Sequence, residues 1–90
     1  SRGLGDVYKR QVYIWYLKIL LSNGETVYGA YQCNAGNSTE AIKQIFDDRF
    51  SAVVFMTPDK SRETALCVII RDISAYWISS KPFEDDKEKQ

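Results

Sequence analysis

The sequence predicts an α+β domain with the element order ββαβββ, in which one helix packs on one face of a single antiparallel sheet. Two runs of strand-forming residues meet at Asn23-Gly24, a stripe of apolar residues at helical spacing follows, and three further β-rich runs complete the chain. The chain has 90 residues, of which 44% are hydrophobic and 13% aromatic. This size and composition indicate one globular domain with a small core.

Residues 15–31 form the first predicted hairpin. Asn-Gly favours a two-residue type I′ turn, because both central positions of that turn need φ > 0. A loop of Asn23 and Gly24 would pair Lys18 with Gly29 and would pair Tyr16 with Tyr31. One face of the hairpin is then expected to be the core face, with Trp15, Leu17, Ile19, Leu21, Tyr28 and Ala30. The other face is half polar, with Tyr16, Lys18, Leu20, Val27, Gly29 and Tyr31.

A helix is expected over residues 38–50. Asn37 or Ser38 is a suitable N-cap, and Asn37 and Glu40 have the spacing of a capping box. The apolar residues recur every three or four positions, which predicts one buried stripe. This stripe consists of Ala41, Ile42, Ile45, Phe46 and Phe50.

Three strands are predicted after the helix, over residues 51–57, 63–70 and 73–79, with a turn at Pro58–Ser61. The first two strands are apolar on both pleat faces, which is typical of strands buried on both faces. One short helix covers only part of one face of a five-stranded sheet. The uncovered apolar face therefore predicts self-association as a homodimer, with a strongly curled sheet and a foreign protein partner as the alternatives.

The two ends are expected to lie outside the domain, which would span residues 12–83. Residues 6–11 resemble the string DVYKRQ that recurs as translated adapter sequence at the start of reading frames assembled from metagenomes. This resemblance implies that residues 1–11 are a non-native leader and that the chain comes from a metagenome; a disordered native arm is the alternative. Residues 84–90 contain no apolar residue and are expected to be a charged, disordered tail.

The composition argues against catalysis and against a bound metal or cofactor. The chain contains no histidine, and its two cysteines, Cys33 and Cys67, cannot form a zinc site alone. Both are expected to be buried, reduced thiols, with a disulfide as the alternative. No phosphate-binding glycine loop, nucleophile motif or convincing carboxylate pair is present. The sequence therefore predicts a protein that is not an enzyme, has no cofactor and binds no metal.

The formal net charge is zero, so no overall field favours nucleic acid or a membrane surface. No run is long enough to span a membrane and no signal-peptide pattern begins the chain, which predicts a cytoplasmic location. Aromatic and basic residues do share the predicted sheet, a combination that also occurs in sheets that bind single-stranded nucleic acid. The predicted interface residues are Tyr16, Lys18, Leu20, Val27, Tyr31, Tyr76 and Trp77.

Two resemblances bear on function. Residues 19–29 resemble the first motif of Sm-like RNA-binding proteins, in which a strand, an Asn-Gly turn and a Φ-x-G pattern recur; this implies a small nucleic-acid-binding sheet domain of Sm or OB type. The whole layout is similar to small phage and mobile-element accessory proteins, including anti-CRISPR proteins. That similarity implies a non-enzymatic inhibitor that binds a host defence protein stoichiometrically. A housekeeping dimeric interaction module is a further alternative.

Overall fold

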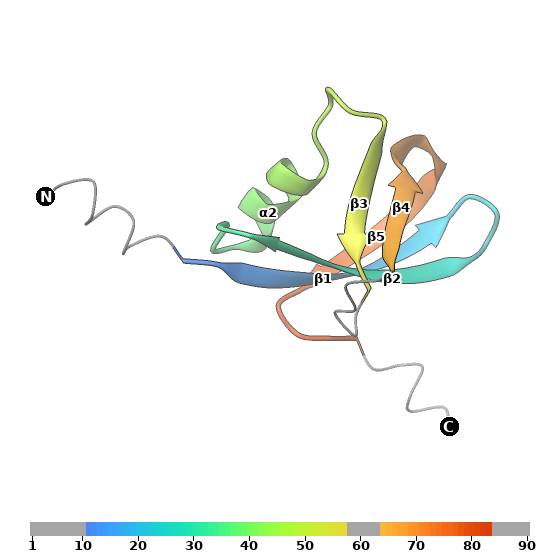
Figure 1. The fold of residues 1–90 in the computed structure, drawn as a ribbon. Coiled ribbons are helices and arrows are strands. Elements are labelled where there is room, and N and C mark those ends of the chain that lie inside the picture. Colours follow the sequence, from blue (N-terminus) through green and yellow to red (C-terminus); the bar gives the residue numbers. More distant parts are fainter. Residues whose placement is uncertain (1–10, 58–63, 84–90) are drawn as a thin grey trace, which may run out of the picture.

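The structure is a computed structural model that describes residues 11–57 and 64–83. It confirms the α+β class and the order ββαβββ, with a single antiparallel five-stranded sheet (Figure 1). The predicted leader, except for Gln11, the turn at Pro58–Ser61 and the charged tail lie outside the described residues. The elements are β1 (Tyr13–Leu21), β2 (Thr26–Cys33), α2 (Ser38–Ile45), β3 (Ala52–Met56), β4 (Ala65–Ile69), the 3₁₀ turn η1 (Ile70–Asp72) and β5 (Ile73–Ser79).

The sheet is strongly curled. Its strand order is β4-β3-β2-β1-β5, so β4 and β5 lie at opposite edges although only η1 joins them in the chain. β2 and β3 share one partner pair, Ala30 and Met56, and the β3–β4 hairpin rises steeply from the plane of β1 and β2 (Figure 1). The Ser22 N–H donates to the carbonyl of Asp72 over 2.7 Å, which ties the β1–β2 turn to η1.

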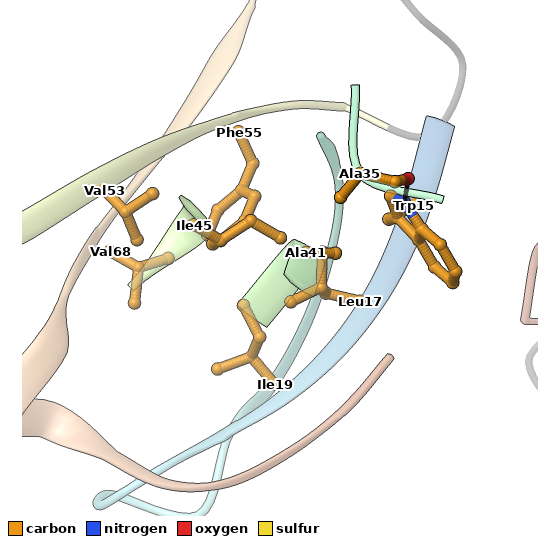
Figure 2. Close-up of a cluster of buried hydrophobic side chains, with 9 residues drawn as sticks. All are labelled: Trp15, Leu17, Ile19, Ala35, Ala41, Ile45, Val53, Phe55 and Val68. Carbon is orange, nitrogen blue, oxygen red and sulfur yellow. Dashed lines mark hydrogen bonds between the residues drawn. The ribbon is translucent and has the colours of Figure 1, made fainter. Parts of the chain in front are cut away.

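The core lies on the concave side of this curled sheet, which we call the inner face. Leu17, Ile19 and Phe55 are the largest fully buried side chains, and each contributes about 1.5–3 kcal/mol by leaving water. Figure 2 shows them together with side chains from β3, β4 and α2. The full cluster consists of Trp15, Leu17, Ile19, Ala35, Ala41, Ile45, Val53, Phe55 and Val68.

The turn between β1 and β2 differs from the predicted one. The Gly24 N–H donates to the Leu21 carbonyl (2.9 Å), and the Leu21 N–H donates to the Glu25 carbonyl (2.8 Å). Gly24 has φ = 93°, and the Asn23 side chain accepts a bond from the Glu25 N–H (2.9 Å). The loop thus has three residues, the arrangement in which a type I turn is followed by a glycine bulge. The prediction of a two-residue type I′ loop was wrong.

The longer loop shifts the register of the hairpin by one residue. Trp15 pairs with Tyr31 and Ile19 pairs with Val27, whereas the prediction paired Tyr16 with Tyr31. Because side chains alternate along a strand, a slip of one residue moves every side chain of β2 to the other face. Val27 and Tyr31 consequently pack against the core. The predicted faces of Val27, Tyr28 and Tyr31 were therefore wrong, although Ala30, predicted as a core residue, is fully buried.

The helix begins as predicted and ends early. Asn37 is the N-cap, and its side-chain oxygen accepts a bond from the Glu40 N–H over 2.9 Å. The helix ends at Ile45 and not near residue 50, because the Asp47 carboxylate accepts the Arg49 N–H (2.9 Å) and starts a turn. Phe50 follows that turn and is 62% exposed. Its predicted place in the buried stripe was wrong.

The last three strands lie where they were predicted, and β5 has the predicted bounds. Within a single chain β3 and β4 are buried on one face only, since Val54 is 58% and Ile69 is 40% exposed, and cover of the other face by a partner stays a prediction. Both cysteines are free: Cys33 is half-buried and Cys67 is exposed, so the expected burial of Cys67 was wrong. The curl explains these exposures, because it leaves one face of the β3–β4 hairpin outside the core.

Candidate functional site

The structure divides the predicted interface residues between the two faces of the sheet. We call the convex side, which is turned away from the core cluster, the outer face. Three residues of β1 lie on the outer face as predicted, namely Tyr16, Lys18 and Leu20. Trp77 of β5, for which no face was predicted, lies on the same side, since it pairs with Lys18. The other three, Val27, Tyr31 and Tyr76, pack against the core on the inner face.

The inner-face aromatics have structural partners. Tyr31 meets Phe55 edge to face, with 6.0 Å between ring centroids. Tyr76 lies 4.5 Å from the ring of Phe46, which follows the last turn of α2. Such pairs contribute about 0.5–1.5 kcal/mol beyond the burial of their area. Tyr31 and Tyr76 are therefore partly buried side chains that pack against the core.

A row of side chains crosses the outer face of β5, β1 and β2. Lys18 pairs with Trp77 on one side and with Tyr28 on the other. The Lys18 ammonium lies 5.3 Å from the centroid of the Trp77 ring, and Tyr28 lies 6.4 Å from the ring of Phe83. Trp77 is 48% exposed, and a cation–π contact at such a site is worth about 0.5–1 kcal/mol. Lys18, Trp77 and Tyr28 of this row therefore already contact other side chains of the same chain.

The outer face of the β3–β4 hairpin carries a second surface, which we call the hairpin patch. Neither β3 (AVVFM) nor β4 (ALCVI) contains a charged residue. Strand pairing places Val54 opposite Cys67 and Ala52 opposite Ile69. The hairpin patch consists of Ala52, Val54, Met56, Ala65, Cys67 and Ile69.

Sequence reasoning found the signal of this patch but not its residues. Both pleat faces of the two strands are apolar, and one short helix leaves an apolar face of the sheet uncovered, which predicted an interface on that face. None of the residues of the hairpin patch was among the predicted interface residues.

A groove of about 320 Å³ runs beside β4. Residues 66–69 form one wall, and the β1–β2 turn forms the other. Its lining residues are Leu21, Ser22, Asn23, Val27, Leu66, Cys67, Val68, Ile69 and Asp72.

Among the described residues, the carboxyl group with a clearly shifted pKa is that of Asp47, in a surface turn. The guanidinium of Arg49 is 2.7 Å from the Asp47 carboxylate, and hydrogen bonds from the Arg49 side chain and backbone lower the pKa of Asp47 to about 2. Asp47 is therefore ionised at neutral pH and acts as an acceptor that holds the turn. In the described part of the chain, no group of three or more His, Cys, Asp or Glu side chains is placed to hold a metal ion. None of the described helices has both the length and the apolar content that a membrane crossing requires.

No protein-family model, curated protein or solved structure matches this chain.

Proposed function

We propose that this protein acts without catalysis, by binding another protein through the hairpin patch. The observation that carries the proposal is the exposure of Val54 (58%) and Ile69 (40%) on two neighbouring strands that contain no charged residue. Contiguous exposed apolar surface of this kind marks interaction sites in soluble proteins. Apolar side chains at the centre of a contact and polar side chains at its rim are the usual anatomy of a protein interface.

Helix α2 is consistent with the same proposal, because its buried residues belong to the core cluster and not to the hairpin patch. Ala41 and Ile45 of α2 belong to the cluster that contains Leu17 of β1 and Phe55 of β3. The helix thus supplies the second layer that a sheet needs on its apolar inner side. The hairpin patch has no such cover from α2.

The particular function that we propose is inhibition of a host defence protein in the bacterial cytoplasm, by a protein encoded on a mobile element. The resemblance of its layout to small phage accessory proteins supports this function. An inhibitor of this kind needs only a surface that fits its target, and the hairpin patch is such a surface.

A phage-plating assay tests this function. Bacterial strains that each carry one defined CRISPR system are challenged with a phage that the system targets, with and without the protein. We expect the wild-type chain to restore plaque formation in one strain of the panel, and the purified chain to form a 1:1 complex with that effector. A panel in which no strain regains plaques and no effector binds would overturn the proposal of inhibition.

A matched pair of variants tests the role of the hairpin patch in the same assay. Val54→Lys places a charge in the patch, and we expect it to abolish both restoration and binding. Gln32→Lys adds the same charge at an exposed position on the outer face of β2 and should leave both intact. Inhibition that survives Val54→Lys would show that the target binds elsewhere.

The cation–π contact of Lys18 with Trp77 favours one second candidate, the binding of single-stranded nucleic acid on the outer face of β1 and β5. Within β1, β2 and β5, however, Lys18 is the one basic residue, which provides little attraction for phosphates. Fluorescence anisotropy with a single-stranded RNA oligonucleotide over a range of salt concentrations distinguishes the two functions. Binding that falls steeply with salt and is lost in Trp77→Ala would favour this candidate.

A further inference from the structure

The outer edge of β4 carries backbone groups that no described strand bonds. β4 is the terminal strand of the order β4-β3-β2-β1-β5 and stands beside β3 in Figure 1. The Ile70 N–H donates to the Ser51 carbonyl over 2.9 Å, which shows that residue 70 directs its backbone groups toward the β3 side. In an antiparallel ladder this direction alternates from residue to residue. Residues 66 and 68 therefore bond β3, and residues 65, 67 and 69 direct their N–H and C=O groups outward.

This edge lacks the features with which natural proteins prevent unwanted strand pairing. Edge strands are usually interrupted by a lysine, a proline or a bulge. β4 has the sequence ALCVI and pairs with β3 in continuous register. A groove lies beside residues 66–69 and separates this part of β4 from the β1–β2 turn. The edge is therefore suited to accept another strand.

We propose that β4 pairs antiparallel with β4 of a second copy of this chain, about a two-fold axis through Cys67. A second copy is favoured as the partner because all five residues of β4 are apolar. When the strand is reversed about Cys67, each residue therefore meets an apolar residue of the other copy. Ala65 would stand opposite the partner subunit's Ile69, and Leu66 opposite the partner subunit's Val68, so each opposed pair is apolar. All three outward residues of each strand would exchange backbone hydrogen bonds, as a two-fold interface requires.

Pairing of this kind would join the two five-stranded sheets edge to edge, with the two β3–β4 hairpins as the four central strands. The two hairpin patches would then form a continuous surface, with Val54 and Ile69 of both copies exposed on the same side. The inference deepens the proposed function and rests on it only for what this enlarged surface binds. It also replaces the interface that the sequence predicted around Tyr16 and Tyr31, since Tyr31 packs against the core.

Substitutions at Cys67 test the pairing by sedimentation equilibrium in reducing buffer. We expect the wild type and Cys67→Ser to have twice the chain mass of 10.4 kDa at micromolar to hundred-micromolar concentrations. Cys67→Lys would bring two ammonium groups face to face on the axis and should yield the monomer mass. Cys67→Pro removes an outward N–H without removing a bond to β3, which edge strands tolerate, and should also yield a monomer.

Circular dichroism verifies that each variant is folded, and Cys67→Lys remains decisive if Cys67→Pro does not fold. A wild-type protein that stays monomeric at several hundred micromolar would overturn the pairing, as would a dimer that survives Cys67→Lys. Neither result would decide the proposed function, which the Val54→Lys variant tests on β3.

A thiol cross-link tests the position of the axis. Opposite residues of a hydrogen-bonded antiparallel pair have Cα atoms about 5.5 Å apart, within the range that a disulfide spans. In the Cys33→Ser variant, two Cys67 thiols would give up two electrons and two protons to oxidised glutathione, which leaves as two reduced glutathione molecules. We expect a covalent dimer in Cys33→Ser and none in Cys67→Ser. A non-covalent dimer that forms no cross-link would overturn the axis through Cys67.

Discussion

Phe55 of β3 packs directly on the backbone of Gly29 in β2. A Cβ atom at position 29 would stand 2.8 Å from Cβ and 2.9 Å from Cγ of Phe55, closer than carbon atoms approach in proteins. Phe55 is 1% exposed and cannot move outward without opening the core. The absence of a side chain at Gly29 is therefore what lets the β3–β4 hairpin fold over the inner face.

We predict that Gly29→Ala lowers the free energy of unfolding by about 1–3 kcal/mol, the usual cost of overpacking a core. Urea denaturation followed by Trp fluorescence measures the change. Gly36→Ala is the matched control, because its new Cβ would meet only Tyr13 at an ordinary contact of 3.7 Å. Equal stability of Gly29→Ala and the wild type would show that β3 does not approach β2 as closely as the structure has it.

The three-residue loop predicts an asymmetry between Asn23 and Gly24. Gly24 has φ = 93°, a conformation that residues with a side chain rarely adopt. We expect Gly24→Val to cost about 1–3 kcal/mol of stability. Asn23→Ala removes only one exposed hydrogen bond to Glu25 and should cost about 0.5–1 kcal/mol. Thermal unfolding compares the two variants. An Asn23→Ala variant as unstable as Gly24→Val would instead favour a loop that depends equally on both residues.

The same loop shows where prediction from the sequence succeeds and where it stops. The position of the turn, the N-cap and the order of the elements follow from local preferences, and the structure confirms them. The register does not follow, because Asn-Gly suits both a two-residue loop and a three-residue loop with a glycine bulge. The bond between Leu21 and Glu25 distinguishes the two, and it depends on how the strands meet.

The candidate site was less predictable than the fold, for a physical reason. Hydrophobicity patterns show which residues avoid water, but they do not show whether the chain itself or a partner covers them. Val54 and Val53 are neighbours of the same type in β3, yet one is exposed and the other is buried. Which of them faces outward depends on the curl of the sheet, and the curl follows from contacts between distant residues such as Gly29 and Phe55.

The N-cap of α2 has a measurable effect on stability. The Asn37 side chain accepts a bond from the Glu40 N–H, one of the donors that a helix leaves unpaired at its first turn. We predict that Asn37→Ala lowers stability by about 1 kcal/mol and that Asn37→Asp restores most of it. Chemical denaturation monitored at 222 nm measures both. Thr39→Ala, at an exposed position in the first turn, is the control and should have little effect. An Asn37→Asp variant that is no more stable than Asn37→Ala would contradict the capping role.

The turn after α2 depends on the ionised form of Asp47. Hydrogen bonds from Arg49 lower the pKa of this carboxyl group from 3.8 to about 2 in the folded protein. Because the folded pKa lies below the unfolded value, the stabilisation is complete above pH 3.8 and is lost as the pH falls toward 2. Carbon-detected NMR titration of the carboxyl group should therefore give a midpoint of about 2 in the wild type. In Arg49→Ala the side-chain bond is lost and the backbone bond from residue 49 remains, so the midpoint should rise but stay below 3.8. A wild-type midpoint at 3.8 would show that Arg49 does not hold Asp47 in solution.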